Sequence, residues 1–204
     1  SRSDVVAAYA LHLTPNAPTG VVVTRPGPLM ASSDRLTITV TGRGGHASEP
    51  SRALDPVPIA CEIVLALQTM VTRRIDVFDP GIITIGRVAA GTTNNIIPEA
   101  AVVEGTMRAV SATTRARLHD GVRRVAEGIA TAHGATATVE VALGYGVTVN
   151  DAGAAATALE VAGDVVGPAM TVTLAHPTMG AEDFSYVVER VPGAMLCLGC
   201  TPHD

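Results

Sequence analysis

The order of strand and helix patterns between Arg35 and Gly144 constrains the fold more than any other feature of the sequence. Residues 35–41 alternate polar and apolar side chains, which predicts a strand with one buried and one wet face. We expect strands at 35–41, 81–88, 101–110 and 139–143, and helices after Asp55-Pro56 and after Thr113, with Asp55 and Thr113 as caps. The order is β-α-β-β-α-β, the ferredoxin-like split arrangement in which helices cover one face of an antiparallel sheet.

The sequence on either side of this domain predicts strands and helices that lack partners of their own. Residues 5–13 and a hairpin-like segment at 20–30 are expected to form strands without helices. Later in the chain we expect helices at 151–166 and 181–190 and a buried strand at 194–198. We therefore divide the chain into 1–33, 34–145 and 146–204, and only the middle segment reads as a complete domain.

Charge and composition exclude one class of partner. The 14 basic residues are all arginine, but 19 acidic residues give a formal net charge of -5, which does not attract a phosphate backbone. Aromatic residues make up only 2% of the chain, so it lacks the platforms on which single-stranded nucleic acid stacks. A hydrophobic content of 47% is enough for a core built from Ala, Val, Ile and Leu. We expect no nucleic-acid partner.

The lengths of the apolar runs and the number of cysteines bear on the cellular compartment of the protein. No apolar run reaches the roughly 18 residues that a membrane helix requires, and the first residues lack the core of a signal peptide. Three cysteines are an odd number without framework spacing, which fits a reducing compartment. Cys197 and Cys200 match CxxC, but neither a following helix nor a second pair supports a redox or zinc site. We expect a cytoplasmic protein with no membrane partner.

Two polar segments are candidates for a loop pair that faces a substrate. Gly42-Arg43-Gly44-Gly45-His46 follows one expected strand, and Asn94-Asn95-Ile96-Ile97-Pro98 precedes another. The alternatives are a tight turn whose glycines need positive φ, a solvent-exposed loop histidine, and an asparagine that only caps its own turn. Either Asn94 or Asn95 could be the residue that faces the ligand. His119 and His133 are expected on the exposed side of the second helix, without partners.

Further motifs occur in a specific order and spacing, and together they cover essentially the whole chain. They are Leu11-His12-Leu13-Thr14-Pro15, residues 25–31, residues 42–50, Asp55-Pro56, Asn95-Ile96-Ile97-Pro98, Gly105-Thr106-Met107-Arg108 and Gly180-Ala181-Glu182-Asp183-Phe184. In these motifs the chain resembles the dinuclear-metal amidohydrolases that include hippurate hydrolase, N-acyl-amino-acid amidohydrolase and the auxin-conjugate hydrolases. The resemblance implies an α/β fold: a ferredoxin-like α+β lid that dimerises, inserted in a partial α/β metallohydrolase catalytic domain formed by the two flanks.

The resemblance also implies roles for individual residues. His12 would be a metal ligand, and His46 would donate a hydrogen bond to the oxyanion in the active site of the partner subunit. Asn95 would contact the substrate, and Arg108 would hold the substrate carboxylate with its planar guanidinium fork. On the sequence alone, a histidine between Leu11 and Leu13 is more often a packed polar residue than a ligand, and the competing interpretation of Arg108 is a solvated strand residue.

The activity implied by the resemblance is hydrolysis of N-acyl amino acids by a metal-activated water. The expected cofactors are divalent metal ions, two of them in the intact enzyme, with Zn, Mn or Co as candidates. The expected partners are the small-molecule substrate and a second copy of the chain, bound through the lid. Glu182 and Asp183 fit the first turn of the expected helix at 181–190, where acidic side chains favour the helix dipole, and their role is left open.

Part of the family pattern is not in this sequence. The His-Asp-x-His metal segment and the paired Glu-Glu general base are missing, and His203 is too close to Gly199 to be the last metal ligand. We therefore expect an internal fragment of a longer enzyme that is inactive alone. The alternatives are a free-standing dimerisation or small-ligand-binding module with a ferredoxin-like sheet, and a redox protein that uses Cys197 and Cys200.

Overall fold

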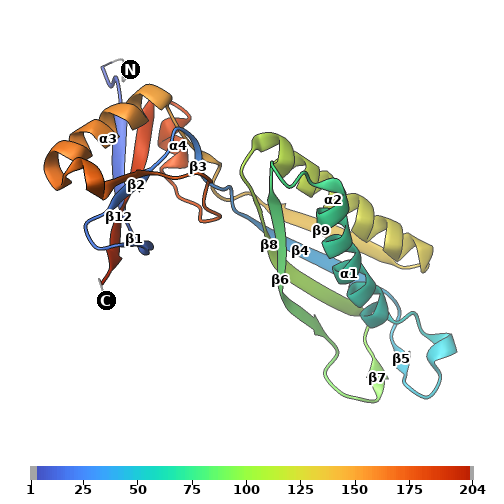
Figure 1. Ribbon diagram of the computed structural model, residues 1–204. Coiled ribbons are helices and arrows are strands. Elements are labelled where there is room, and N and C mark those ends of the chain that lie inside the picture. Colours follow the sequence, from blue (N-terminus) through green and yellow to red (C-terminus); the bar gives the residue numbers. More distant parts are fainter. Residues whose placement is uncertain (1–3, 203–204) are drawn as a thin grey trace. The chain divides into compact units, whose positions relative to one another are not determined.

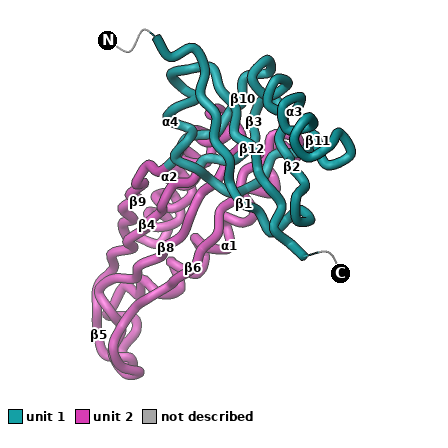
Figure 2. Tube along the Cα trace, turned by 90° about the vertical axis from the view of Figure 1, so that its left-hand side faces the viewer, with its two compact units in different colours: residues 1–32, 145–204 teal, residues 33–144 magenta. Residues whose placement is uncertain are grey.

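The computed structural model describes residues 4–202, which form two compact units. Unit 1 comprises residues 1–32 and 145–204, and unit 2 comprises residues 33–144 (Figure 2). Each unit has hydrophobic clusters of its own. His203, considered above, lies outside the described residues. In the described part of the chain, no helix has both the length and the apolarity needed to cross a membrane.

Unit 2 has the β-α-β-β-α-β order that the sequence predicts. Its sheet has the strand order β6-β8-β4-β9, with all neighbouring strands antiparallel. The strands are β4 (Asp34–Thr41), β6 (Gly81–Ala90), β8 (Ala100–Ala109) and β9 (Thr136–Ala142). Helices α1 (Pro56–Arg74) and α2 (Ala112–Ala132) cover one face of the sheet (Figure 1). The predicted split α+β fold is therefore confirmed.

The helices of unit 2 begin where side chains can cap their first amides. The Oδ1 atom of Asp55 accepts a hydrogen bond from the Val57 amide at 2.9 Å, which confirms the predicted cap of α1. The predicted cap of α2 is wrong, because Ser111 rather than Thr113 precedes its first turn. The Ser111 hydroxyl accepts from the Thr114 amide at 3.0 Å, and the same hydroxyl donates to Asp79 at 2.7 Å.

The core of unit 2 lies between the sheet and the helices. Leu36, Ile38 and Val40 of β4 are fully buried against α1 and α2, whereas the alternate residues face the other side of the sheet. Gly121 of α2 allows the helices to pack closely, since a Cβ atom there would lie 2.9 Å from the Met70 sulfur of α1. Burial of this apolar surface is the main source of stability for unit 2.

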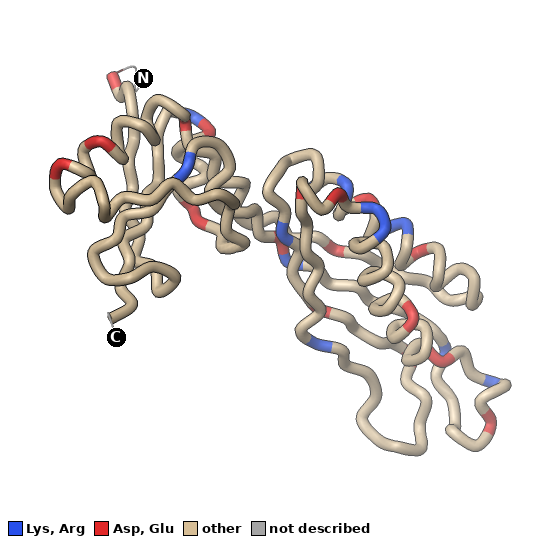
Figure 3. Tube along the Cα trace, in the orientation of Figure 1, with Lys and Arg blue, Asp and Glu red and all other residues tan. Residues whose placement is uncertain are grey.

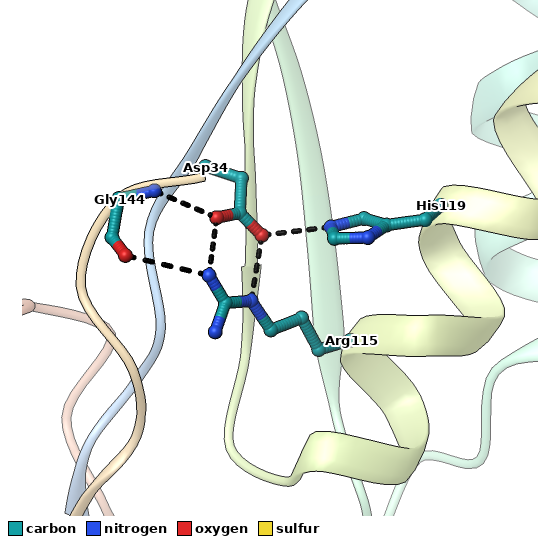
Figure 4. Close-up of polar contacts among 4 residues, drawn as sticks. All are labelled: Asp34, Arg115, His119 and Gly144. Carbon is teal, nitrogen blue, oxygen red and sulfur yellow. Dashed lines mark hydrogen bonds and ion pairs between the residues drawn. The ribbon is translucent and has the colours of Figure 1, made fainter. Parts of the chain in front are cut away.

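A polar network lies at the first and last residues of unit 2 (Figure 4). The carboxylate of Asp34 is buried and accepts two hydrogen bonds from Arg115 of α2, at 2.6 and 2.8 Å. His119 Nε2 lies 2.8 Å from the same carboxylate, and the Gly144 amide donates to it at 3.0 Å. The expectation that His119 and His133 lack partners is therefore wrong, since His133 also pairs with Glu62 at 2.7 Å.

Unit 1 is built on a mixed sheet with the strand order β1-β12-β2-β11. Strands β1 and β12 are parallel, as are β2 and β11, whereas β12 and β2 are antiparallel. The bounds are β1 (Ala8–Pro18), β2 (Val22–Thr24), β3 (Gly27–Met30), β10 (Thr148–Asn150), α3 (Ala152–Val166), the 3-10 turn η2 (Pro168–Met170), β11 (Thr171–Thr173), α4 (Ser185–Val188) and β12 (Gly193–Thr201). Helix α3 packs on the sheet through Ala154, Ala155 and Ala158.

Two sequence expectations for unit 1 are wrong. Segment 20–30 is not a hairpin, because β2 joins the mixed sheet and β3 pairs with β10 instead. The helix expected at 181–190 is reduced to the single turn of α4, and Glu182 and Asp183 precede it. The buried strand expected at 194–198 is confirmed as part of β12.

Asn150 connects the two sheets of unit 1. Its side-chain carbonyl accepts from the Met195 amide of β12 at 2.8 Å. Its side-chain amide donates to the Arg25 carbonyl at 2.9 Å and to the Thr24 hydroxyl at 3.0 Å. These polar groups are buried and cannot hydrogen-bond to water. The hydrogen bonds within the protein take the place of the lost hydrogen bonds to water. They fix β12, and thereby β1 beside it.

Strand β1 is the last strand on one side of the mixed sheet and has a bare apolar face. Tyr9, Leu11 and Leu13 project from this face and are 50%, 64% and 61% exposed. Together with Val161 and Val165 of α3, Tyr9 and Leu11 line an open groove of about 570 Å³. Among the described residues, nothing covers this part of the face.

The Asp34 network predicts an acid-sensitive contribution to stability. Burial alone would raise the pKa of Asp34, but hydrogen bonds from Arg115, the Gly144 amide and His119 outweigh it and hold the pKa below its ordinary value of 3.8. A carboxyl whose pKa is lower in the folded state stabilises the fold above its unfolded pKa, and this contribution is lost as the pH falls through the folded pKa.

We therefore expect Asp34→Asn to lower the free energy of unfolding by about 1–3 kcal/mol at pH 7, since hydrogen bonds to a buried charge are lost. The difference between wild type and variant should stay constant down to about pH 5 and shrink below pH 3.8. Urea unfolding followed by circular dichroism measures it. Glu104→Gln, which removes the carboxylate of the exposed Arg87–Glu104 pair, is the control and should change little. If the free energies of unfolding of wild type and Asp34→Asn differ by the same amount down to pH 2, the ionised carboxylate of Asp34 is not the source of the stabilisation.

Candidate functional site

The two polar segments singled out in the sequence lie side by side in unit 2. Strand β5 (Gly45–His46) pairs antiparallel with β7 (Ile96–Ile97), so that His46 lies opposite Ile96. The Ala47 amide also donates to the Asn95 carbonyl at 3.1 Å. Strand β5 lies in the connection after β4, and β7 lies in the connection before β8. Their pairing joins the two connections into one two-stranded ribbon (Figure 1). The ribbon holds His46 and Asn95 near each other.

The glycines of this ribbon serve close packing rather than a tight turn with positive φ. Neither Gly42, Gly44 nor Gly45 has positive φ. A Cβ atom at Gly42 would lie 2.0 Å from the Leu54 carbonyl oxygen, a distance that no side chain can occupy. The backbone of 42–45 therefore packs directly against the segment that includes the 3-10 turn η1 (Pro50–Arg52) and leads into α1. The alternative of a tight turn with positive φ is therefore wrong at these positions.

The contacts of His46 determine which ring nitrogen holds its proton. The Ser48 backbone amide donates to His46 Nδ1 at 3.2 Å, and the Ser48 hydroxyl lies 2.7 Å from the same atom. A backbone amide can only donate, so Nδ1 acts as an acceptor and the neutral ring has its proton on Nε2. His46 is exposed, and its Nε2–H can therefore donate to a bound molecule.

Asn95 lies in the turn before β7 and is exposed, as is Asn94. The Asn95 side-chain carbonyl accepts from the Thr93 hydroxyl at 3.2 Å. This contact is local, of the kind expected if the asparagine shapes its own turn. It orients the side-chain amide on the ribbon that also holds His46.

Arg108 is not near His46 and Asn95 within one copy of the chain. It lies near the end of β8 opposite Ile82 of β6, and its neighbours Met107 and Ala109 point into the core. Arg108 thus projects from the sheet face opposite the helices. The ribbon joins β8 at its first residue, Ala100, so strand geometry separates the two places by roughly 27 Å.

His12 lies in unit 1, near the carboxyl end of the regular pairing of β1. Its Nδ1 atom is 3.5 Å from Glu182 Oε1, and its side chain is 53% exposed. Cys197 is opposite His12 in the parallel pairing with β12, and the two side chains share one face of the sheet. Glu182 is the residue that sequence reasoning left without a role. The sequence shows that Glu182 is acidic and belongs to the motif Gly180-Ala181-Glu182-Asp183. It does not show that Glu182 contacts His12, which is 170 positions away.

The donors at His12 fit a metal ion only in part. An imidazole and a carboxylate are suitable ligands, but the described residues contain no group of three or more His, Cys, Asp or Glu side chains that could hold a metal. Cys197 does not fill the gap, because burial raises its pKa and the charge of Glu182 raises it further. A raised pKa disfavours the thiolate that metal binding and thiol redox chemistry both require.

Comparison with known proteins agrees with this architecture. Residues 32–133 match the Peptidase dimerisation domain of the M20 family. The chain is 35% identical over 195 residues to an N-acetyldiaminopimelate deacetylase of Leuconostoc citreum, covering 94% of this chain and 49% of that protein. It is 36% identical over 197 residues to an N-acetylcysteine deacetylase of Bacillus subtilis, covering 97% of this chain and 51% of that protein.

A solved structure supports the same assignment. The crystal structure of a Bacillus subtilis dinuclear metal binding peptidase from the M20 family superimposes with a TM-score of 0.79 and 32% identity, covering 99% of this chain and 50% of that chain. The present chain thus spans about half the length of the relatives it matches. Together, the domain match, the sequence relatives and the shared fold show that the chain belongs to the M20 family of peptidases and amidohydrolases.

Proposed function

We propose that this chain is part of a homodimeric enzyme that hydrolyses the amide bond of N-acyl amino acids. The observation that supports this most directly is the hydrogen bonding of His46, which leaves Nε2–H as a donor on an exposed ribbon. A tetrahedral oxyanion that forms on the attacked carbonyl needs such a donor. The two deacetylase relatives are named for N-acetylated amino acids, which agrees with this substrate class.

The site would be assembled from two copies of the chain. Arg108 and the His46 ribbon are roughly 27 Å apart along β8, too far to bind one small substrate within one copy. In the proposed dimer, formed through unit 2, His46 of one copy serves the active site of the other. Asn95 and Arg108 are the proposed substrate contacts, with the Arg108 fork suited to a carboxylate.

His12 is the proposed metal ligand of this chain. A divalent metal pair, with Zn, Mn or Co as candidates, would supply an activated water and polarise the scissile carbonyl. Because the described residues offer no complete ligand set, the other ligands and the general base would have to come from elsewhere in a protein of the relatives' full length. Glu182 near His12 Nδ1 would favour an orientation in which Nε2 faces the metal.

The first test is His46→Ala in a full-length protein that includes this chain. We expect kcat for an N-acetyl amino acid to fall by roughly 10²- to 10³-fold, because one oxyanion donor is lost. His133→Ala, which removes the histidine that follows α2 and pairs with Glu62, is the control and should retain activity. Equal activity of His46→Ala and wild type would favour the alternative of a binding module.

The second test concerns the metal. His12→Ala should lower metal retention after dialysis, measured by elemental analysis, because one ligand is lost. Chelator treatment should abolish hydrolysis, and added Zn, Mn or Co should restore it. His176→Ala is a histidine control in unit 1. If His12→Ala and wild type retain the same metal content, His12 is not a ligand.

The third test concerns the dimer. Sedimentation equilibrium of the 204-residue chain should give about twice the 20.8 kDa of one copy, because the dimerisation domain is present. The exposed apolar face of β1 could also cause association, so the measurement should be repeated on Leu11→Glu. A dimer through unit 2 predicts the same mass for both proteins. If the wild-type chain or Leu11→Glu sediments as a monomer, the result argues against a dimer through unit 2.

A further inference from the structure

The two ends of unit 2 lie together and are bound to each other. The chain enters unit 2 at Ser33 and leaves it at Gly144. Strands β4 and β9 are antiparallel neighbours, with Arg35 opposite Ala142, which brings these ends side by side. They are in direct contact, since a Cβ atom at Gly144 would lie 2.2 Å from the Ser33 carbonyl oxygen. No residue other than glycine fits this contact without a shift of the backbone.

The carboxylate of Asp34 joins both ends to α2 (Figure 4). Its Oδ1 accepts from the Gly144 amide at 3.0 Å and from Arg115 Nη2 at 2.6 Å. Its Oδ2 accepts from Arg115 Nε at 2.8 Å and lies 2.8 Å from His119 Nε2. Arg115 Nη2 also donates to the Gly144 carbonyl at 3.4 Å. One carboxylate thus holds the first strand, the last residue and one helix of the unit.

This network differs from the exposed ion pairs of the same unit in burial and in the number of contacts. The side chain of Asp34 is 1% exposed, and those of Arg115 and His119 are 22% and 20% exposed. By contrast, Glu62 and His133 form a single contact with side chains 54% and 46% exposed. Charge-assisted hydrogen bonds with little water access are strong, whereas exposed pairs contribute little.

The network lies at the end of the apolar core. Asp34 is the first residue of β4, on the same face as Leu36 and Ile38, and it pairs with the buried Met107 of β8. Loss of the charge removes the hydrogen bonds at this last position, whereas the apolar residues farther along β4 keep their partners. Regions held by few apolar contacts open locally before the core unfolds.

We propose that Asp34, Arg115, His119 and Gly144 form a latch that keeps the two ends of unit 2 closed, and that the negative charge of Asp34 holds it shut. While the latch is shut, the two chain segments that join unit 2 to unit 1 are anchored at one point. With the charge removed, the segments around Ser33 and Gly144 separate and move independently. This conformational device does not depend on the proposed catalytic function.

Hydrogen exchange of the 204-residue chain tests the latch. We compare wild type, Asp34→Asn and the matched control Glu62→Gln, which removes an exposed carboxylate that also pairs with a histidine, His133 at the end of α2. The measured quantity is the exchange rate of the Ala142 and Gly144 amides divided by that of the Ala47 amide, which donates to the Asn95 carbonyl in the β5–β7 ribbon and exchanges by local opening of that ribbon. We expect this ratio to rise by roughly tenfold or more in Asp34→Asn and to stay unchanged in Glu62→Gln.

A second variant tests whether the carboxylate itself is needed. Asp34→Ala leaves a space beside Arg115 and His119 that a formate ion can enter. Added formate should return the exchange ratio toward the wild-type value, and chloride at the same ionic strength should not. Unchanged ratios in Asp34→Asn, a uniform rise over all of unit 2, or complete unfolding of the unit would each overturn the proposal. Equal effects of formate and chloride would overturn it as well.

Discussion

Pairing of β4 with both of its neighbours is the constraint on which unit 2 depends. The eight residues of β4 pair with β8 over their whole length, and residues 35–41 also pair with β9. This double pairing fixes which residues face the helices, so Leu36, Ile38 and Val40 enter the core together. It also places the ends of the unit next to each other. A slip by one residue would turn the apolar side chains to the open face and move Asp34 away from Arg115.

The sequence predicted the elements of unit 2 well because their signals are local. Alternation in 35–41 and the Asp55-Pro56 start depend on residues within one strand or one turn, and both are confirmed. Segment 20–30 and the helix at 181–190 were wrong because tertiary contacts decide them. β2 and β3 read as a hairpin, but strands distant in the sequence, β12 and β10, provide their partners. Ser111 replaced Thr113 as the cap because Asp79 holds its hydroxyl.

The candidate site shows the same division between local and distant information. His46 and Asn95 were predicted from their own loops, and the structure pairs these loops. The role of Glu182 beside His12 depends on a contact across 170 positions, and that of His119 beside Asp34 on one across 85 positions. No periodicity or capping rule reports such contacts. The separation of Arg108 from His46 is also a property of the sheet, and it supports the proposal that one site uses residues of two copies.

Strand β1 has a consequence for the cellular handling of the chain. It ends its sheet in the described structure, its side chains Tyr9, Leu11 and Leu13 are exposed, and it contains no Lys, Arg, Asp or Glu. Natural edge strands normally use charges, bulges or covering segments to prevent further strand addition. The register irregularity of β1 lies between Thr14 and Pro18, beyond the exposed residues 9–13. While β1 is bare, during synthesis or after proteolysis, the polypeptide would be a target for chaperones and prone to aggregation. The yield of native protein would then depend on how quickly this strand is covered, as well as on the stability of the two cores.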